Sequence, residues 1–91
     1  MQDILIRDLM TTLGSIIKKY RISQDKTIYK ISAECSVPKS TWREAELGLC
    51  KDINLTTLWK ISEGLNVPPY KILKELKNEL GTGFSLTGLD E

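Results

Sequence analysis

The stretch VPKSTWREAELG, residues 37–48, decides how the chain is expected to fold. Pro38 suits the first turn of a helix, where its missing N–H costs nothing, and Gly48 suits the position just after a helix. Trp42 and Ala45 are three residues apart, so they lie on the same side of this helix, next to Val37. The stretch therefore predicts a short helix whose apolar side packs inward.

The opposite side of this short helix carries positive charge. Lys39 and Arg43 are four residues apart, so both project from the side that faces away from Trp42. A charged side of this kind is ordinarily just solvated surface. The alternative, functional interpretation is that it contacts a polyanion.

The segment before residue 37 predicts a second helix and a very short connection. In TIYKISAEC, residues 27–35, Thr27 can cap a helix in which Ile28, Ile31 and Cys35 recur at helical spacing. Only about three residues then separate this helix from the next, which is the spacing of a helix-turn-helix.

The remaining periodicity predicts three further helices. Residues 3–21 form one amphipathic helix, either continuous or broken near Thr11 and Thr12. Asn54 can cap the next helix and Asn66 can end it in the left-handed conformation. Its expected buried stripe is Leu55, Leu58, Ile61 and Leu65.

Pro68 and Pro69 stop that helix and start the last one, which Gly81 closes. The residues of this last helix expected to face the core are Ile72, Leu73, Leu76 and Leu80. The prediction is thus an all-α, compact five-helix fold. It comprises a helical extension over residues 1–12, a domain over residues 13–81 and a flexible, glycine-containing tail over residues 82–91.

Charge is distributed unevenly along the chain, although the net charge is only +1. Residues 17–43 contain seven basic and two acidic residues and therefore carry +5. The remainder is negative on balance. A basic region on a nearly neutral protein of 91 residues is the pattern expected of a nucleic-acid binder.

Composition argues against other classes of protein. The chain has no histidine, and Cys35 and Cys50 do not form a CxxC pair, so we expect no catalytic site, metal site, cofactor or small-molecule ligand. No apolar run reaches the length of a membrane span, and the first ten residues do not look like a signal peptide. We therefore expect a cytoplasmic protein with no membrane contact that is not an enzyme.

Three segments carry a resemblance to a known family. IKKYR, VPKSTWREAELG and LTTLWKISEGLNVPPYKIL together resemble the lambda-repressor-like, Cro-type helix-turn-helix domains, also called the xenobiotic response element family. The resemblance runs from about Ile17 to Leu73. It implies a lambda-repressor-like fold in which the second and third helices form a helix-turn-helix. It further implies a sequence-specific DNA-binding regulator, expected to be a repressor, that reads the major groove of double-stranded DNA as a homodimer.

The resemblance also implies roles for individual residues. The expected base-contacting residues are Lys39, Ser40, Arg43 and Glu44, of which Glu44 has pairing with Lys51 as its alternative. The expected phosphate-contacting residues are Lys18, Lys19, Arg21, Thr41 and Lys51. Trp42 is expected in the core rather than in a stacking role.

Two positions depart from the family pattern. Ile28 stands where a glutamine is usual, which removes an expected phosphate contact. Ser36 stands at the tight turn where a glycine is usual, because that position takes a positive φ. A serine there costs on the order of 1 kcal/mol, which a folded domain tolerates.

The N-terminal extension has more apolar residues than one buried stripe needs. We expect it to hold the homodimer through Ile4, Leu5, Ile6, Leu9 and Met10, with Phe84 and Leu86 of the tail as further candidates. The alternative is that the extension folds back onto its own core and the dimer forms elsewhere or only on DNA. The alternative function is a protein-interaction module, such as an antitoxin or adaptor, built on the same fold.

Overall fold

The computed structural model describes residues 2–88, which form five α-helices and no β-strand. The predicted tail therefore lies only partly within the described residues, because residues 89–91 fall outside them. The helices are α1 (Gln2–Ser23), α2 (Ile28–Cys35), α3 (Lys39–Leu47), α4 (Leu55–Gly64) and α5 (Pro69–Leu80). The all-α, five-helix prediction is confirmed for this part of the chain.

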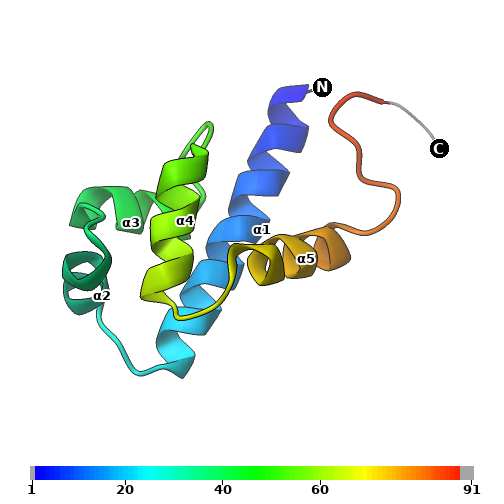
Figure 1. Cartoon of the computed structure of the whole chain (residues 1–91). Coiled ribbons are helices and arrows are strands. Elements are labelled where there is room, and N and C mark those ends of the chain that lie inside the picture. Colours follow the sequence, from blue (N-terminus) through cyan, green and yellow to red (C-terminus); the bar gives the residue numbers. More distant parts are fainter. Residues whose placement is uncertain (1, 89–91) are drawn as a thin grey trace.

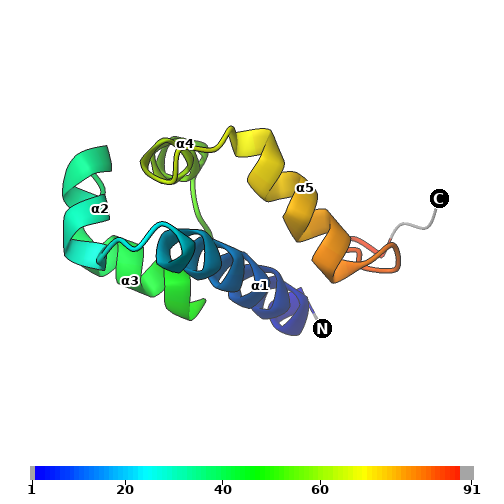
Figure 2. The same cartoon turned by 90° about the horizontal axis from the view of Figure 1, so that it is seen from below.

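The long helix α1 is the axis on which the others are arranged (Figure 1). α3 packs along one side of α1 and α5 along another, while α2 closes the far end against α3 and α4 (Figure 2). The radius of gyration of the Cα atoms is 13.2 Å, near the value of about 12 Å for a compact domain of this length. Crossing a membrane takes a long apolar helix, and the described part of the chain contains none.

The helix ends follow the signals in the sequence. The side chain of Thr27 accepts a hydrogen bond from the N–H of Lys30 at the start of α2, and that of Asn54 accepts one from the N–H of Thr57 at the start of α4. Ser36 and Asn66 take positive φ values of 60° and 58° after α2 and α4. Each of these four predictions is confirmed.

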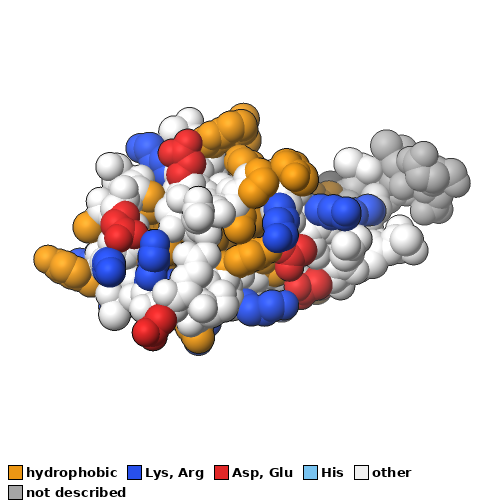
Figure 3. Space-filling model, turned by 60° about the horizontal axis from the view of Figure 1, so that its bottom comes forward, with side chains coloured by type: hydrophobic (Ala, Val, Ile, Leu, Met, Phe, Trp, Pro, Cys, Tyr) orange, Lys and Arg blue, Asp and Glu red, His pale blue; other side chains and the backbone are white. Residues whose placement is uncertain are grey.

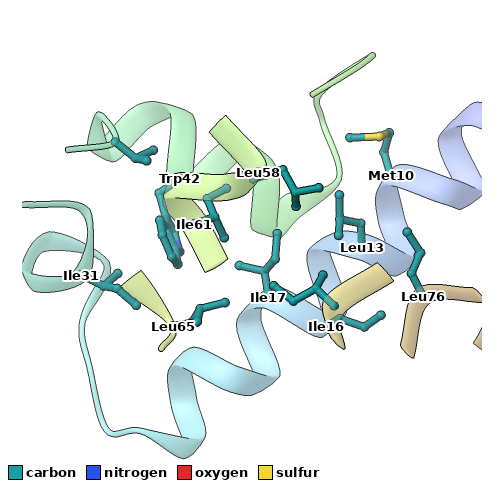
Figure 4. Packing of buried hydrophobic residues seen from close by; sticks show 13 residues of the cluster. Met10, Leu13, Ile16, Ile17, Ile31, Trp42, Leu58, Ile61, Leu65 and Leu76 are labelled. Atoms are coloured by element: carbon teal, nitrogen blue, oxygen red, sulfur yellow. The ribbon is translucent and has the colours of Figure 1, made fainter. Parts of the chain in front are cut away.

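A single apolar cluster joins all five helices (Figure 4). Trp42 points from α3 into this cluster, on the side where Ile31 and Ile61 lie, and it is fully buried. The predicted inward side of α3 is thus confirmed. The buried residues of the cluster are Met10, Leu13, Ile16, Ile17, Ile31, Val37, Trp42, Ala45, Leu58, Ile61, Leu65, Ile72 and Leu76.

Close contact between α1 and α3 depends on Gly14, in the middle of α1. A Cβ atom at this position would lie 2.4 Å from the carbonyl oxygen of Ala45 and 2.6 Å from that of Glu46. Both are backbone atoms that cannot move aside alone. The absence of a side chain at Gly14 therefore lets the two helix backbones approach closely enough for α3 to be held firmly.

Polar contacts complete the attachment of the helices. The hydroxyl of Tyr20 in α1 donates a hydrogen bond to Glu75 in α5. Burial, followed by this contact with Glu75, raises the pKa of Tyr20 to about 12. The side-chain amide of Gln24 donates to the carbonyl oxygen of Leu65, at a distance of 2.6 Å, and ties the end of α1 to the end of α4.

The structure differs from the sequence prediction at several positions. Leu55 and Leu73, expected in the core, are exposed, because each lies at the edge of its helix's buried stripe. Of the two alternatives left open for the first helix, α1 follows the continuous one, through Thr11 and Thr12. Pro38 precedes the first turn of α3 as its N-cap residue instead of lying within that turn.

Candidate nucleic-acid interface

The exposed side of α3 is the candidate site. Lys39 and Arg43 were predicted from spacing to face outward, and both are exposed in the structure, whereas Trp42 and Ala45 on the other side are buried. We call this set the α3 outer side: Lys39, Ser40, Arg43, Glu44 and Leu47. A rigid helix anchored by a buried indole presents these side chains in fixed order.

An ion pair holds α3 against α1 from beneath. The guanidinium of Arg21 donates from Nε to Oε2 of Glu46 at 2.5 Å and from Nη2 to Oε1 at 2.9 Å. The indole Nε1 of Trp42 donates to the same Oε2 at 2.7 Å. One carboxylate of α3 therefore satisfies both the buried indole and the cation on α1, which fixes the orientation of the α3 outer side.

This ion pair favours a role for Arg21 that differs from the predicted one. We expected Arg21 to contact phosphate, but its side chain is only 13% exposed and that of Glu46 only 4%. Its third nitrogen, Nη1, donates to the carbonyl oxygen of Lys26 at 2.8 Å. The hydrogen bonds to Glu46 raise the pKa of Arg21.

A residue that sequence reasoning missed lies beside the α3 outer side. Tyr29, in the first turn of α2, is exposed, and the Nζ atom of Lys39 lies 5.0 Å from the centre of its ring. This cation–π contact joins α2 to α3 across the connection between them. The signal in the sequence was that Tyr29 directly follows the inward-facing Ile28 at the start of α2, so the two side chains do not lie on the same side of the helix.

The other predicted phosphate contacts lie on neighbouring elements. Lys18 and Lys19 are exposed on α1, and Lys51 is exposed in the loop between α3 and α4. Thr41 is half-buried in α3. The alternative pairing of Glu44 with Lys51 does not occur among the ion pairs formed within residues 2–88.

Positive charge on this surface is only partly neutralised. Lys26 forms an ion pair with Glu34 at 2.9 Å, and this contact lowers the pKa of Glu34. Lys30, Lys39 and Arg43 have no carboxylate partner among the ion pairs of the described residues. The face seen in Figure 3 carries acidic and basic side chains next to hydrophobic patches.

The residues predicted to form the dimer interface differ in their exposure. Met10 is only 3% exposed and lies in the apolar cluster with Leu13 and Leu76 (Figure 4), so it does not belong to an interface. Ile6 and Leu9 are partly buried against the same cluster. This part of the extension follows the alternative of folding back onto its own core, while Ile4 is exposed and Leu5 is half-exposed.

The site offers no arrangement of the kind that holds a metal. Within residues 2–88 the Cys, Asp and Glu side chains form no group that can surround an ion. Cys35 and Cys50 are free thiols, and burial raises the pKa of each, with Glu44 adding to the effect at Cys50. Both sulfurs are therefore held in the less reactive neutral form.

Comparison of this chain with known protein families, with curated proteins and with solved structures finds no match. The functional interpretation consequently depends on the chain's own residues and geometry.

Proposed function

We propose that this chain is a sequence-specific DNA-binding regulator of the repressor type, in which α2 and α3 form a helix-turn-helix and α3 enters the major groove. The observation that carries this proposal is the α3 outer side: Lys39 and Arg43 project four residues apart from a helix whose inner side is locked by Trp42. Lysine and arginine to guanine O6 and N7 are the commonest specific contacts in that groove.

The connection between α2 and α3 supports the same proposal. Only residues 36–38 separate the two helices, with Ser36 in the left-handed conformation and Val37 buried between them. Such a joint fixes one short helix across another, which is what a helix-turn-helix requires. Lys18, Lys19 and Lys51 are exposed on adjoining elements and are proposed to contact phosphates.

A homodimer is part of the proposal, because one α3 helix offers too few base contacts for useful specificity. Two-fold pairing places two such helices on successive major grooves, about 34 Å apart, over a pseudo-palindromic site. Selection of bound sequences from random duplex DNA tests this directly. A two-fold symmetric consensus supports the proposal, and recovery of no sequence preference contradicts it.

The second candidate function is a protein-interaction module. It is favoured by the exposed apolar side chains Leu55 and Trp59 on α4, which are not part of the α3 outer side. Salt dependence separates the two functions, because displacement of counterions from DNA makes binding fall steeply as salt rises. If the chain does not bind duplex DNA even at low salt, the protein-interaction module is favoured.

Substitution of Arg43 with alanine is expected to weaken binding to the selected site by about 1–3 kcal/mol and to relax preference at one base pair. Lys19→Ala is expected to weaken binding to all sequences alike and to reduce the salt slope by about one unit, since phosphate contacts carry no sequence information. Fluorescence anisotropy titrations across salt concentrations measure both effects. Lys77→Ala, an exposed lysine on α5, serves as the control. Wild-type binding by both variants would contradict the assigned surface.

Tyr29 is expected to act on binding through Lys39. Tyr29→Ala removes the ring that holds the Lys39 ammonium, and we expect specific affinity to fall by about 0.5–1 kcal/mol, the size of an exposed cation–π contact. Tyr29→Phe keeps the ring and is expected to bind as the wild type does. If the phenylalanine variant binds as weakly as the alanine variant, the hydroxyl and not the ring is responsible.

A further inference from the structure

A pocket opens between the first turns of α1 and the loop that joins α3 to α4. Its apolar part comes from Ile6 and Cys50, and Asp3, Arg7 and Lys51 add charge around it. Ile6 and Cys50 also pack against the apolar cluster, so the base of the pocket is continuous with the core. We call this the α1–loop pocket.

Two exposed leucines belong to this part of the chain. Leu49 lines the pocket and is nevertheless 67% exposed, and Leu47, the last residue of α3, is exposed as well. The pocket and the exposed leucine thus stand side by side on one surface. Apolar side chains grouped beside an apolar pocket are typical of an interface.

We propose that a second copy of this chain covers this surface, with Leu49 of each protomer inserted into the α1–loop pocket of its partner. A two-fold axis between the pocket and the leucine allows both insertions together, because a two-fold interface uses the same surface patch on both protomers. The charges are compatible with such pairing, because the pocket lining contains both signs, with Asp3 negative and Arg7 and Lys51 positive.

The other exposed apolar face lacks this self-complementarity. Leu55 and Trp59 on α4 line a separate depression in which Lys60 is the charged residue. Two copies meeting there would bring like charges together, which disfavours pairing. The α1–loop pocket is therefore the better interface for a second copy.

The position of the interface bears on the proposed DNA binding. Leu47 ends α3, so a two-fold axis near Leu49 brings the C-terminal ends of two α3 helices toward each other and leaves the Lys39 ends pointing apart. The inference rests on the homodimer of the proposed function and replaces the interface predicted on the N-terminal extension. Of those predicted residues, Ile6 remains part of the interface, whereas Met10 does not.

Sedimentation of the full chain without DNA tests this inference, with two leucine variants that are matched in exposure. Leu49 and Leu55 are each 67% exposed, so an aspartate at either position should leave the fold intact, which circular dichroism checks. We expect the wild type and Leu55→Asp to sediment as dimers at tens of micromolar and Leu49→Asp as a monomer. Leu49→Ala, too small to fill the pocket, should weaken the dimer in the same direction.

A monomeric wild type, a dimeric Leu49→Asp variant or a monomeric Leu55→Asp variant would each overturn the inference. Because the measurement contains no DNA, it is separate from the test of function. A dimer that Leu49→Asp breaks but that binds no duplex would refute DNA binding and leave the interface standing. DNA binding by a chain that stays monomeric would refute the interface and leave DNA binding standing.

Discussion

Replacement of Trp42 with alanine is expected to unfold much of the protein at room temperature. The indole is fully buried where α2, α3 and α4 meet, and its Nε1 donates to Glu46. Removing so large a buried side chain costs about 3–5 kcal/mol, through lost burial and the cavity left behind. A domain of this size has a total stability near the lower end of about 5–15 kcal/mol, so the loss is a large part of it. Urea and thermal unfolding followed by circular dichroism measure the change.

Trp59 provides the matched control for this experiment. It is the other tryptophan of the chain, lies on α4 and is 51% exposed. Trp59→Ala should therefore change the free energy of unfolding far less than Trp42→Ala, because little packing is lost. Equal effects of the two substitutions would show that Trp42 does not have the central place in the core that its burial indicates.

The sequence predicted the direction of side chains on α3 well. Spacing alone separated Lys39 and Arg43 from Trp42 and Ala45, because a helix turns 100° per residue and leaves no choice once one side is apolar. Caps and left-handed residues were equally predictable, since Thr27 and Ser36 act through contacts within their own few residues. Local rules are sufficient where the determining interactions are local.

Burial at the edges of helices was less predictable. Leu55 is four residues before Trp59, so it lies on the same exposed side of α4 as Trp59. Leu58 and Ile61 lie on the buried side. Leucine is apolar in either place, so composition does not say whether a neighbour covers it. For Met10 the error was the opposite one, because a residue expected at the surface is buried. α5 places Leu76 in the same cluster from a distant part of the sequence.

Contacts between charged groups far apart in sequence were the hardest to foresee. Arg21 and Glu46 are 25 positions apart, and nothing in the sequence says that α1 passes beneath the end of α3. Arg21 belongs to the most basic stretch of the chain, which made an outward role the natural prediction. The close approach allowed by Gly14 brings the two helices together and makes the pairing possible.

Loss of the Glu46 carboxylate is accordingly expected to destabilise the fold, although no residue of the α3 outer side is replaced. Glu46→Ala leaves the Arg21 guanidinium nearly buried without its partner and the Trp42 indole N–H without its acceptor. We expect a loss of about 3 kcal/mol, the lower end of the range for breaking a buried ion pair, because Arg21 keeps some contact with solvent. Glu44→Ala, an exposed carboxylate on the same helix, should change the unfolding free energy little.

The counterpart substitution, Arg21→Ala, decides between the two roles considered for that residue. If Arg21 acts through Glu46, its loss should lower the unfolding midpoint. The double variant with Glu46→Ala should then be less destabilised than the sum of the single variants, since the second substitution removes a charge already without its partner. If Arg21 instead contacts phosphate, Arg21→Ala should leave the midpoint unchanged and lower the salt slope of DNA binding by about one unit. Its two hydrogen bonds to Glu46 and its low exposure lead us to expect the first result.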